Sequence, residues 1–128
     1  MTVGVSRDII WVSSSLEDLR RFPEPVRKVM GFALFQAQCG GKHLQARPLK
    51  GFGGAGVLEV VEDFDGNVFR AVYTVRFADV VYVLHAFQKR SKRGIETTRR
   101  EMEVVRSWPR LARDADRSRA SRKEGEGP

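Results

Sequence analysis

The sequence predicts one α+β domain, in which helices pack on an antiparallel sheet, and three observations lead to this prediction. Apolar residues first recur at helical spacing in two neighbouring stretches, and then alternate along three stretches rich in Val, Tyr and Phe. A chain of 128 residues that is 41% hydrophobic and 30% charged can bury one core. We therefore expect one domain over residues 1–112 and a disordered basic tail over 113–128, which has almost nothing apolar to bury.

The N-terminal part is predicted to form a strand and a helical hairpin. Apolar residues over 3–12 indicate a first strand that ends at a run of three serines. Leu, Leu and Phe recur every third residue over 16–22, which predicts a short helix capped by one of those serines and ended by Pro23. A second helix is predicted over 25–39, because apolar residues follow the i, i+3, i+4, i+7 pattern until two glycines end it.

The C-terminal part is predicted to form a three-stranded meander and a last helix. The glycine-rich stretch 42–56 is expected to be a mobile loop without a regular element. Asp65-Gly66 and Ala78-Asp79 read as the turns between strands. The strands are predicted over 57–64, 67–77 and 80–88, and the helix over 95–108. Together with the first strand, the meander forms the antiparallel sheet on which the N-terminal hairpin and the C-terminal helix pack.

Several classes of protein are disfavoured by what the sequence lacks. No apolar run approaches the roughly 20 residues of a membrane-spanning helix, and the N-terminus lacks the pattern of an export signal, so we expect a cytoplasmic protein. Cys39 is the only cysteine, which excludes an internal disulfide. His43 and His85 are far apart in the sequence, so we expect neither a metal nor another cofactor.

The charge points to a polyanionic partner. The formal net charge is +7 and the pI is about 10.2, and a surplus of Lys and Arg attracts nucleic acid through counterion release. The basic residues are also concentrated locally. Opposed only by Glu96, the cluster consists of Lys89, Arg90, Lys92, Arg93, Arg99 and Arg100. Nucleic acid or an acidic protein is therefore the expected partner, although a solvated basic surface would have the same composition.

Counting residues outward from the Ala78-Asp79 turn predicts which side chains share a face of the sheet. The count gives these cross-strand pairs: Val72 with His85, Arg70 with Phe87, and Val68 with Lys89. One face of the sheet is therefore predicted to carry Arg70, His85, Phe87 and Lys89 together with Glu59 of the preceding strand. We expect Arg70 to be a surface residue there. The opposite, core-facing side is predicted to carry Phe69, Ala71, Tyr73, Val75, Tyr82, Leu84 and Ala86.

The charged face has two interpretations. Glu59 and Arg70 could form an ordinary cross-strand salt bridge, with His85 as a packed aromatic residue. The whole set instead favours an anion-binding face with the groups needed to cut RNA without a metal. Glu59 or His85 could transfer protons, and Phe87 could stack on a base. The phosphate and the RNA backbone could be bound by Arg70, Lys89, Arg90, Lys92 and Arg93.

Four motifs within residues 49–103 carry a resemblance to a known family. They are Leu49-Lys50-Gly51, Leu58-Glu59-Val60, Phe69-Arg70-Ala71-Val72-Tyr73, and His85-Ala86-Phe87-Gln88-Lys89-Arg90-Ser91-Lys92. With the helical hairpin before them, they resemble the phage-derived, HigB-like branch of the RelE/ParE toxins. The matching stretch covers a little under half of the chain.

The resemblance implies the toxin of a type II toxin–antitoxin system. It implies an endoribonuclease that cuts messenger RNA on the translating ribosome, is neutralised by a helix-turn-helix antitoxin, and contacts operator DNA only through that antitoxin. Arg70 matches the family's strand arginine, Lys89 and Arg90 match its basic pair, and Lys50 joins the RNA-binding set. The sequence departs from the RelE pattern in lacking a tyrosine after the last basic strand, which leaves the proton-transferring residue open, with His85 as the substitute candidate. That departure leaves two alternatives, a ParE-like gyrase inhibitor and a non-catalytic, basic nucleic-acid-binding protein of phage origin.

Overall fold

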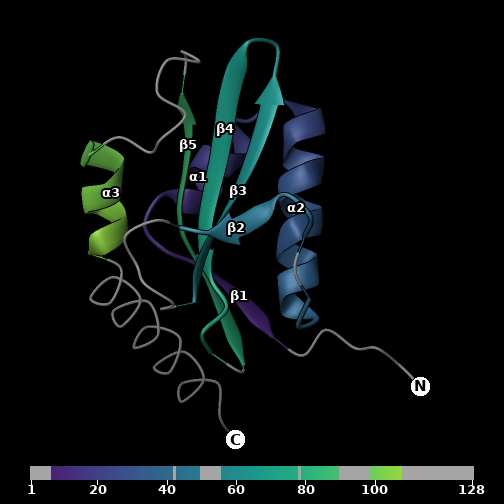
Figure 1. The fold of residues 1–128 in the computed structure, drawn as a ribbon, viewed down its shortest axis with the longest axis vertical. Coiled ribbons are helices and arrows are strands. Elements are labelled where there is room, and N and C mark those ends of the chain that lie inside the picture. Colours follow the sequence, from purple (N-terminus) through teal and green to yellow (C-terminus); the bar gives the residue numbers. More distant parts are fainter. Residues whose placement is uncertain (1–6, 42, 50–55, 78, 90–98, 108–128) are drawn as a thin grey trace, which may run out of the picture.

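The α+β class is confirmed by a computed structural model that describes residues 7–41, 43–49, 56–77, 79–89 and 99–107. The elements are β1 (Asp8–Trp11), α1 (Ser15–Arg20), α2 (Glu24–Gln38), β2 (Ala46–Pro48), β3 (Val57–Phe64), β4 (Asn67–Thr74), β5 (Val80–Lys89) and α3 (Arg99–Arg106). The five strands form one sheet in the order β1-β5-β4-β3-β2. The helices α2 and α3 lie on opposite sides of this sheet (Figure 1). The predicted tail over 113–128 lies outside the described residues.

The helical hairpin forms as predicted. Pro25 lies in the first turn of α2, where its missing N–H leaves no intrahelical bond unmade. The inward stripe of α2 consists of Val26, Met30, Ala33, Leu34 and Ala37, all buried. The predicted serine cap of α1 is wrong, because neither Ser14 nor Ser15 caps the helix through its side chain. Ser14 Oγ instead donates to the Asp18 carboxylate at 2.8 Å, and the buried Ser15 Oγ donates to the Val83 carbonyl at 3.0 Å, which fastens α1 to β5.

The prediction of a wholly antiparallel sheet is wrong, because β1 runs parallel to β5. The N–H of Val12 donates to the carbonyl of Val83 at 3.0 Å, and the N–H of Asp8 donates to that of Asp79 at the same distance. Two helices separate β1 from the strands that follow, so no hairpin fixes its direction. Apolar alternation shows that a strand has one buried face, but it carries no information about the direction of its neighbour.

The prediction that 42–56 contains no regular element is also wrong. Ala46–Pro48 forms β2, which pairs with β3 so that Arg47 lies opposite Glu59. A three-residue strand is too short to show an alternating pattern. Pro48 is compatible with pairing here because β2 is the edge of the sheet, where one side of the strand needs no backbone donor.

The predicted register of β4 and β5 is confirmed at the distal end of the hairpin and wrong near its turn. Val68 pairs with Lys89, Arg70 with Phe87, and Val72 with His85, as counted. The next residue, Tyr73, pairs with Val83, so β5 contains one extra residue, Leu84, in a β-bulge. A bulge reverses the alternation of side chains between the two faces of the strand. Tyr82 and Leu84 were predicted to face the helical hairpin, and they instead lie in the apolar cluster on the side of the sheet that α3 covers.

Each face of the sheet has its own apolar cluster. Beneath α1 and α2, Phe22 meets Phe69 edge-on at 4.9 Å between ring centroids, in a cluster that includes Met30 and Tyr73. On the other face, Val105 of α3 is completely buried against a cluster that includes Leu84. Among the described helices, none is long and apolar enough to cross a membrane.

Tyr73 provides a test of the core under the hairpin. Its side chain is fully buried, and its hydroxyl has no hydrogen-bond partner within the described residues. Burial raises the pKa of Tyr73 from 10.0 to about 12, so the folded state favours the neutral phenol. This contribution to stability is complete below pH 10 and is lost as the pH rises from 10 through 12.

We expect Tyr73→Phe to raise the free energy of unfolding by about 1 kcal/mol at pH 7, because it removes a buried polar group that lacks a partner. The variant should also lose less stability than the original chain between pH 10 and pH 12. Urea unfolding at pH 7 and at several alkaline pH values measures both effects. A variant that is less stable at pH 7, with an unchanged alkaline decline, would contradict the expectation.

Candidate functional site

One row of side chains crosses four strands on the α3 side of the sheet. In the strand register, Arg47 lies opposite Glu59, Glu59 opposite Val72, and Val72 opposite His85. The neighbouring row places Arg70 opposite Phe87. Strands lie about 4.8 Å apart, so the backbones at Glu59 and His85 are about 10 Å from one another. The predicted grouping of Glu59, Arg70, His85 and Phe87 on one face is therefore confirmed, while their functional roles stay predictions.

Glu59 is held between two arginines. Arg70 Nη1 donates to Glu59 Oε2 and Arg47 Nε donates to Glu59 Oε1, both at 2.9 Å. The Glu59 and Arg70 side chains are 6% and 1% exposed, whereas that of Arg47 is 56% exposed. The cluster Arg47–Glu59–Arg70 thus runs from the surface into the interior of the sheet.

The expectation that Arg70 is a surface residue is wrong. Its side chain is buried, and Nε and Nη2 have no hydrogen-bond partner within the described residues. The alternation of β4 correctly placed Arg70 on the face opposite the helical hairpin, but the expectation that the C-terminal helix packs on the same side as the hairpin is wrong. α3 covers the face that bears Arg70, and a covered sheet face buries even charged residues when a carboxylate compensates them. Two unused donors on a buried guanidinium are costly, and an anionic oxygen is the chemical group that matches them best.

His85 is held by a carboxylate from α3. Its Nε2 is hydrogen-bonded to Glu101 Oε2, and its ring stacks on Phe87 with centroids 4.9 Å apart and planes 26° from parallel. The two side chains are partly exposed, 16% for His85 and 26% for Glu101. A histidine whose ring is oriented by a carboxylate and a stacked aromatic, and which still reaches the surface, is suited to transfer protons.

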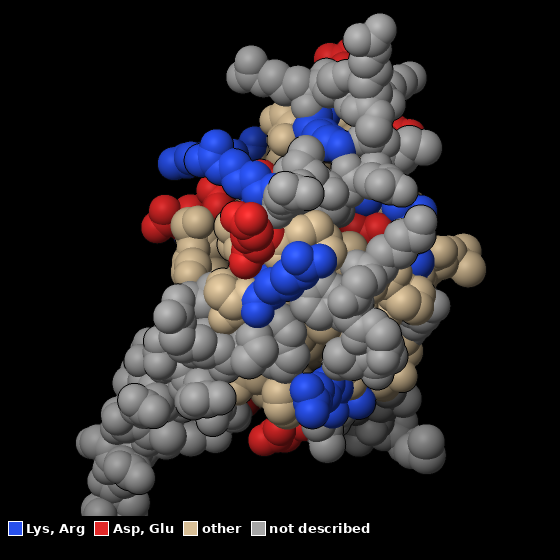
Figure 2. Space-filling model, turned by 60° about the vertical axis from the view of Figure 1, so that its left-hand side comes forward, with Lys and Arg blue, Asp and Glu red and all other residues tan. Residues whose placement is uncertain are grey.

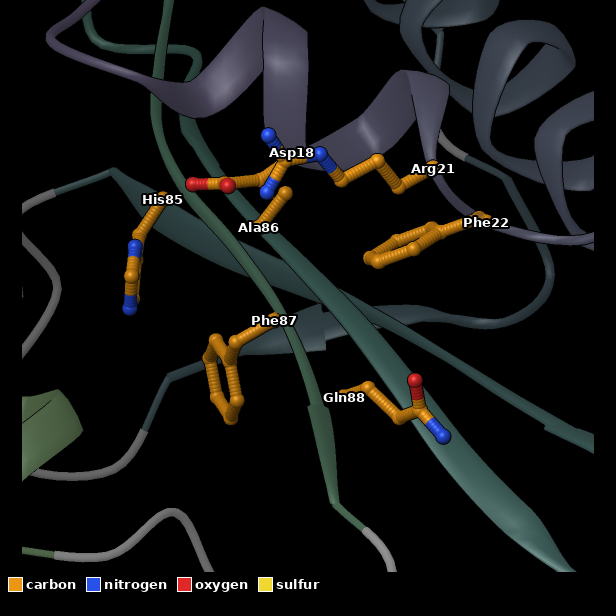
Figure 3. Close-up of a pocket in the computed structure, with 7 residues that line it drawn as sticks. All are labelled: Asp18, Arg21, Phe22, His85, Ala86, Phe87 and Gln88. Atoms are coloured by element: carbon orange, nitrogen blue, oxygen red, sulfur yellow. The ribbon is translucent and has the colours of Figure 1, made fainter.

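A pocket of about 290 Å³ lies beside His85, between α1 and β5 (Figure 3). Its lining residues are Asp18, Arg21 and Phe22 from α1 and the segment after it, and His85, Ala86, Phe87 and Gln88 from β5. The site therefore combines the cluster Arg47–Glu59–Arg70, a histidine–carboxylate pair and an adjoining cavity.

The predicted basic cluster is only partly described. Lys89 ends β5 and is half-buried, while Lys50, Arg90, Lys92 and Arg93 lie outside the described residues. In Figure 2 the coloured Lys and Arg side chains occur in several separate places, some of them next to acidic ones. Within the described ranges, no group of three or more His, Cys, Asp or Glu side chains is placed to hold a metal ion.

A comparison with protein families identifies the chain. The model of the family described as phage-derived protein Gp49-like (DUF891) matches residues 17–107, well over half of the 128 residues. The chain belongs to the Gp49-like family. This is a toxin-like family in the context of RelE/ParE-type toxin–antitoxin systems. No curated protein and no solved structure matches the chain.

The Gp49-like region contains these residues, and among them the sequence did not single out the ion-pair partners Arg47 and Glu101 or the pocket residues from α1 and the segment after it. Arg47 was missed because it lies on the unpredicted β2. Glu101 was missed although a signal for it exists, since it lies one helical turn before Val105, whose apolar side chain marks the inner side of α3. Residues four apart on a helix share a face, so a carboxylate there points toward the sheet.

Proposed function

We propose that this Gp49-like protein is the toxin of a type II toxin–antitoxin system, in the HigB-like branch of the RelE/ParE toxins, and cuts messenger RNA on the ribosome. It acts in the cytoplasm without a metal, and a helix-turn-helix antitoxin neutralises it. The observation that carries the proposal is the His85–Glu101 pair, which lies on the same face as the buried Arg70, whose Nε and Nη2 have no partner among the described residues. Membership of a toxin-like family supports the general class.

The proposed reaction uses the RNA's own 2'-hydroxyl as the nucleophile. His85 accepts the 2'-hydroxyl proton, a bond forms between the 2'-oxygen and phosphorus, and the bond from phosphorus to the 5'-oxygen breaks. The imidazolium, or water in equilibrium with it, returns a proton to the leaving 5'-oxygen. Arg70 Nε and Nη2 donate to the phosphate oxygens as negative charge accumulates on them. The products are a 2',3'-cyclic phosphate and a 5'-hydroxyl end.

Glu59 has a supporting role in this scheme. Both of its oxygens accept hydrogen bonds from arginines, so it is less suited than His85 to remove a proton. It instead fixes the guanidinium of Arg70 and compensates its charge. Because Arg70 is only 1% exposed, a phosphate reaches its donors after this face opens, and cleavage of free RNA is expected to be slow compared with cleavage on the ribosome.

Cleavage of a defined messenger RNA by the purified chain tests the proposal. We expect cuts in the presence of translating ribosomes and excess EDTA, with cyclic phosphate and 5'-hydroxyl ends. A matched messenger RNA with a single 2'-deoxynucleotide at the mapped site should resist cleavage at that position only, because it lacks the nucleophile. Intact RNA with and without ribosomes would contradict the proposal, and blocked DNA supercoiling by gyrase in the same preparation would favour the ParE-like alternative.

A further inference from the structure

The pocket beside His85 follows the edge of β5. Its lining includes the four successive residues from His85 to Gln88. Successive side chains of a strand point to opposite faces, so four in a row line one pocket only if it wraps around the strand's edge. The pairing of β1 with β5 stops at Val83, and beyond that point no described strand lies along this edge of β5, while β4 continues to pair with its other edge. The result is an edge groove, which connects the face that bears His85 with the α1 side of the sheet.

The floor and walls of the edge groove are apolar and aromatic. Phe22 and Phe87 are 6% and 8% exposed, and Ala86 is 2% exposed. Figure 3 shows the two phenylalanine rings on opposite sides of the β5 ribbon, with the Gln88 amide nearby. The volume of about 290 Å³ lies near the lower end of the range for small-molecule sites, roughly 300–1,000 Å³. A flat aromatic ring is the type of group that such walls accommodate.

The rim of the edge groove carries polar groups of complementary kinds. Asp18 and Arg21 are three residues apart at the end of α1, so they lie on the same side of that helix. Within the described part of the chain they form no ion pair with one another, and one Asp18 oxygen accepts the Ser14 hydroxyl. Arg21 and Gln88 are exposed. A guanidinium, a carboxylate and an amide thus surround an aromatic-lined space.

Guanine is the nucleobase that matches this rim best. Its O6 and N7 both accept hydrogen bonds and match the paired donors of an arginine, whereas adenine presents an amino donor in place of O6. Its N1–H and 2-amino group donate and match a carboxylate. Cytosine has adjacent acceptors at O2 and N3 but no pair of adjacent donors for the carboxylate, and uracil has no two adjacent acceptors. The chemistry of Asp18 and Arg21 therefore selects guanine among the four bases.

We propose that the edge groove is a guanine-binding subsite that holds one base of the RNA next to His85. The inference rests on the proposed function, because the bound guanine is a base of the RNA that the protein cuts. Since His85 lines both the groove and the proposed reaction site, a base bound in the groove lies beside the bond that is cut. Arg21, Asp18 and Gln88 then set the sequence preference of the toxin.

Titration of the purified chain with the four nucleoside monophosphates tests the subsite without requiring catalysis. Backbone amide shifts of Ala86, Phe87 and Gln88 report binding in the groove. We expect GMP to bind about tenfold more tightly than AMP, CMP or UMP, in line with one good bidentate contact. Arg21→Ala and Asp18→Asn should each reduce GMP affinity to about that of the other nucleotides. Arg20→Ala is the matched control, because Arg20 is an exposed arginine of α1 that does not line the groove, and it should keep the preference.

The possible results separate this inference from the proposed function. Equal affinity for all four nucleotides and for inorganic phosphate would overturn the subsite in favour of simple anion binding. Absence of shifts at β5, or a GMP preference that survives Arg21→Ala and Asp18→Asn, would also overturn it. RNA cleavage together with any of these results would leave the proposed function intact. A GMP preference that depends on Arg21, in a chain that cuts no RNA, would support the subsite and contradict the cleavage proposal.

Discussion

Arg70→Ala is expected to lower the free energy of unfolding by about 3–5 kcal/mol, because it leaves the Glu59 carboxylate buried without its inner partner. Glu59 is 4% exposed as a residue, so water cannot replace the lost guanidinium. Typical domains are stable by about 5–15 kcal/mol, so a loss of this size removes a large share of the stability and unfolds a domain at the lower end of that range. Loss of toxicity in this variant would therefore say little about catalysis.

Urea unfolding of Arg70→Ala and of Arg47→Ala measures this expectation and supplies its matched control. Both arginines bind the same carboxylate at 2.9 Å, but the Arg47 side chain is 56% exposed. Solvent screens the Arg47–Glu59 pair because Arg47 is so exposed, and Arg47→Ala should lower the free energy of unfolding by about 1 kcal/mol or less. If the free energy of unfolding of Arg70→Ala lies within about 1 kcal/mol of that of the original chain, the Glu59–Arg70 pair does not contribute as expected.

A double variant separates the stability of the pair from its function. Replacing both members of a buried ion pair by apolar residues of similar size is often neutral or stabilising. Glu59→Leu combined with Arg70→Met is therefore expected to fold with nearly the original stability. Growth arrest should nevertheless be lost if Arg70 binds the phosphate. Full toxicity of the folded double variant would exclude Arg70 from the site.

The alternation of β4 and β5 was enough to predict which side chains share the α3 face. The turn dipeptides Asp65-Gly66 and Ala78-Asp79 marked the ends of the strands, and counting outward from the second one gave the pairing of Arg70 with Phe87. The same count failed next to the turn, because the bulge at Leu84 has no signature in the apolar pattern. Local patterns therefore located the charged face and misplaced the residues beyond the bulge.

The burial and partners of the site residues could not be predicted from local sequence. Charged residues are mostly exposed, which made a surface position the natural expectation for Arg70. Its burial depends on Glu59 across the sheet, and that carboxylate is also bound by Arg47 from β2, a strand without a detectable pattern. The contact of His85 with Glu101 joins residues 16 apart in sequence through a helix that packs on the strand. Such contacts are tertiary, and spacing along the chain does not encode them.

His85→Gln is expected to reduce RNA cleavage on ribosomes by about 10²–10⁴-fold, the usual contribution of a group that transfers protons. Glutamine retains a polar side chain next to Phe87 but cannot take up a proton. The free energy of unfolding should change by about 1 kcal/mol, mainly from the lost ring stacking on Phe87. The cleavage rate should depend on pH in the original chain and be nearly independent of pH in the variant, because glutamine cannot take up or release a proton. An unchanged rate in a folded His85→Gln protein would remove His85 from the mechanism.

Glu101 is expected to act as a positioning residue, and its variants show whether the His85–Glu101 pair is functional or only holds α3 on the sheet. Glu101→Gln can keep a hydrogen bond to His85 but not the negative charge that stabilises an imidazolium. A functional pair predicts a slower maximal rate and a shifted pH profile with little change in stability, and partial rescue by Glu101→Asp. A pair that only anchors α3 predicts lower stability, with the pH profile of the remaining activity unchanged. If Glu101→Gln leaves the profile where it was, the carboxylate does not assist proton transfer and His85 acts without it.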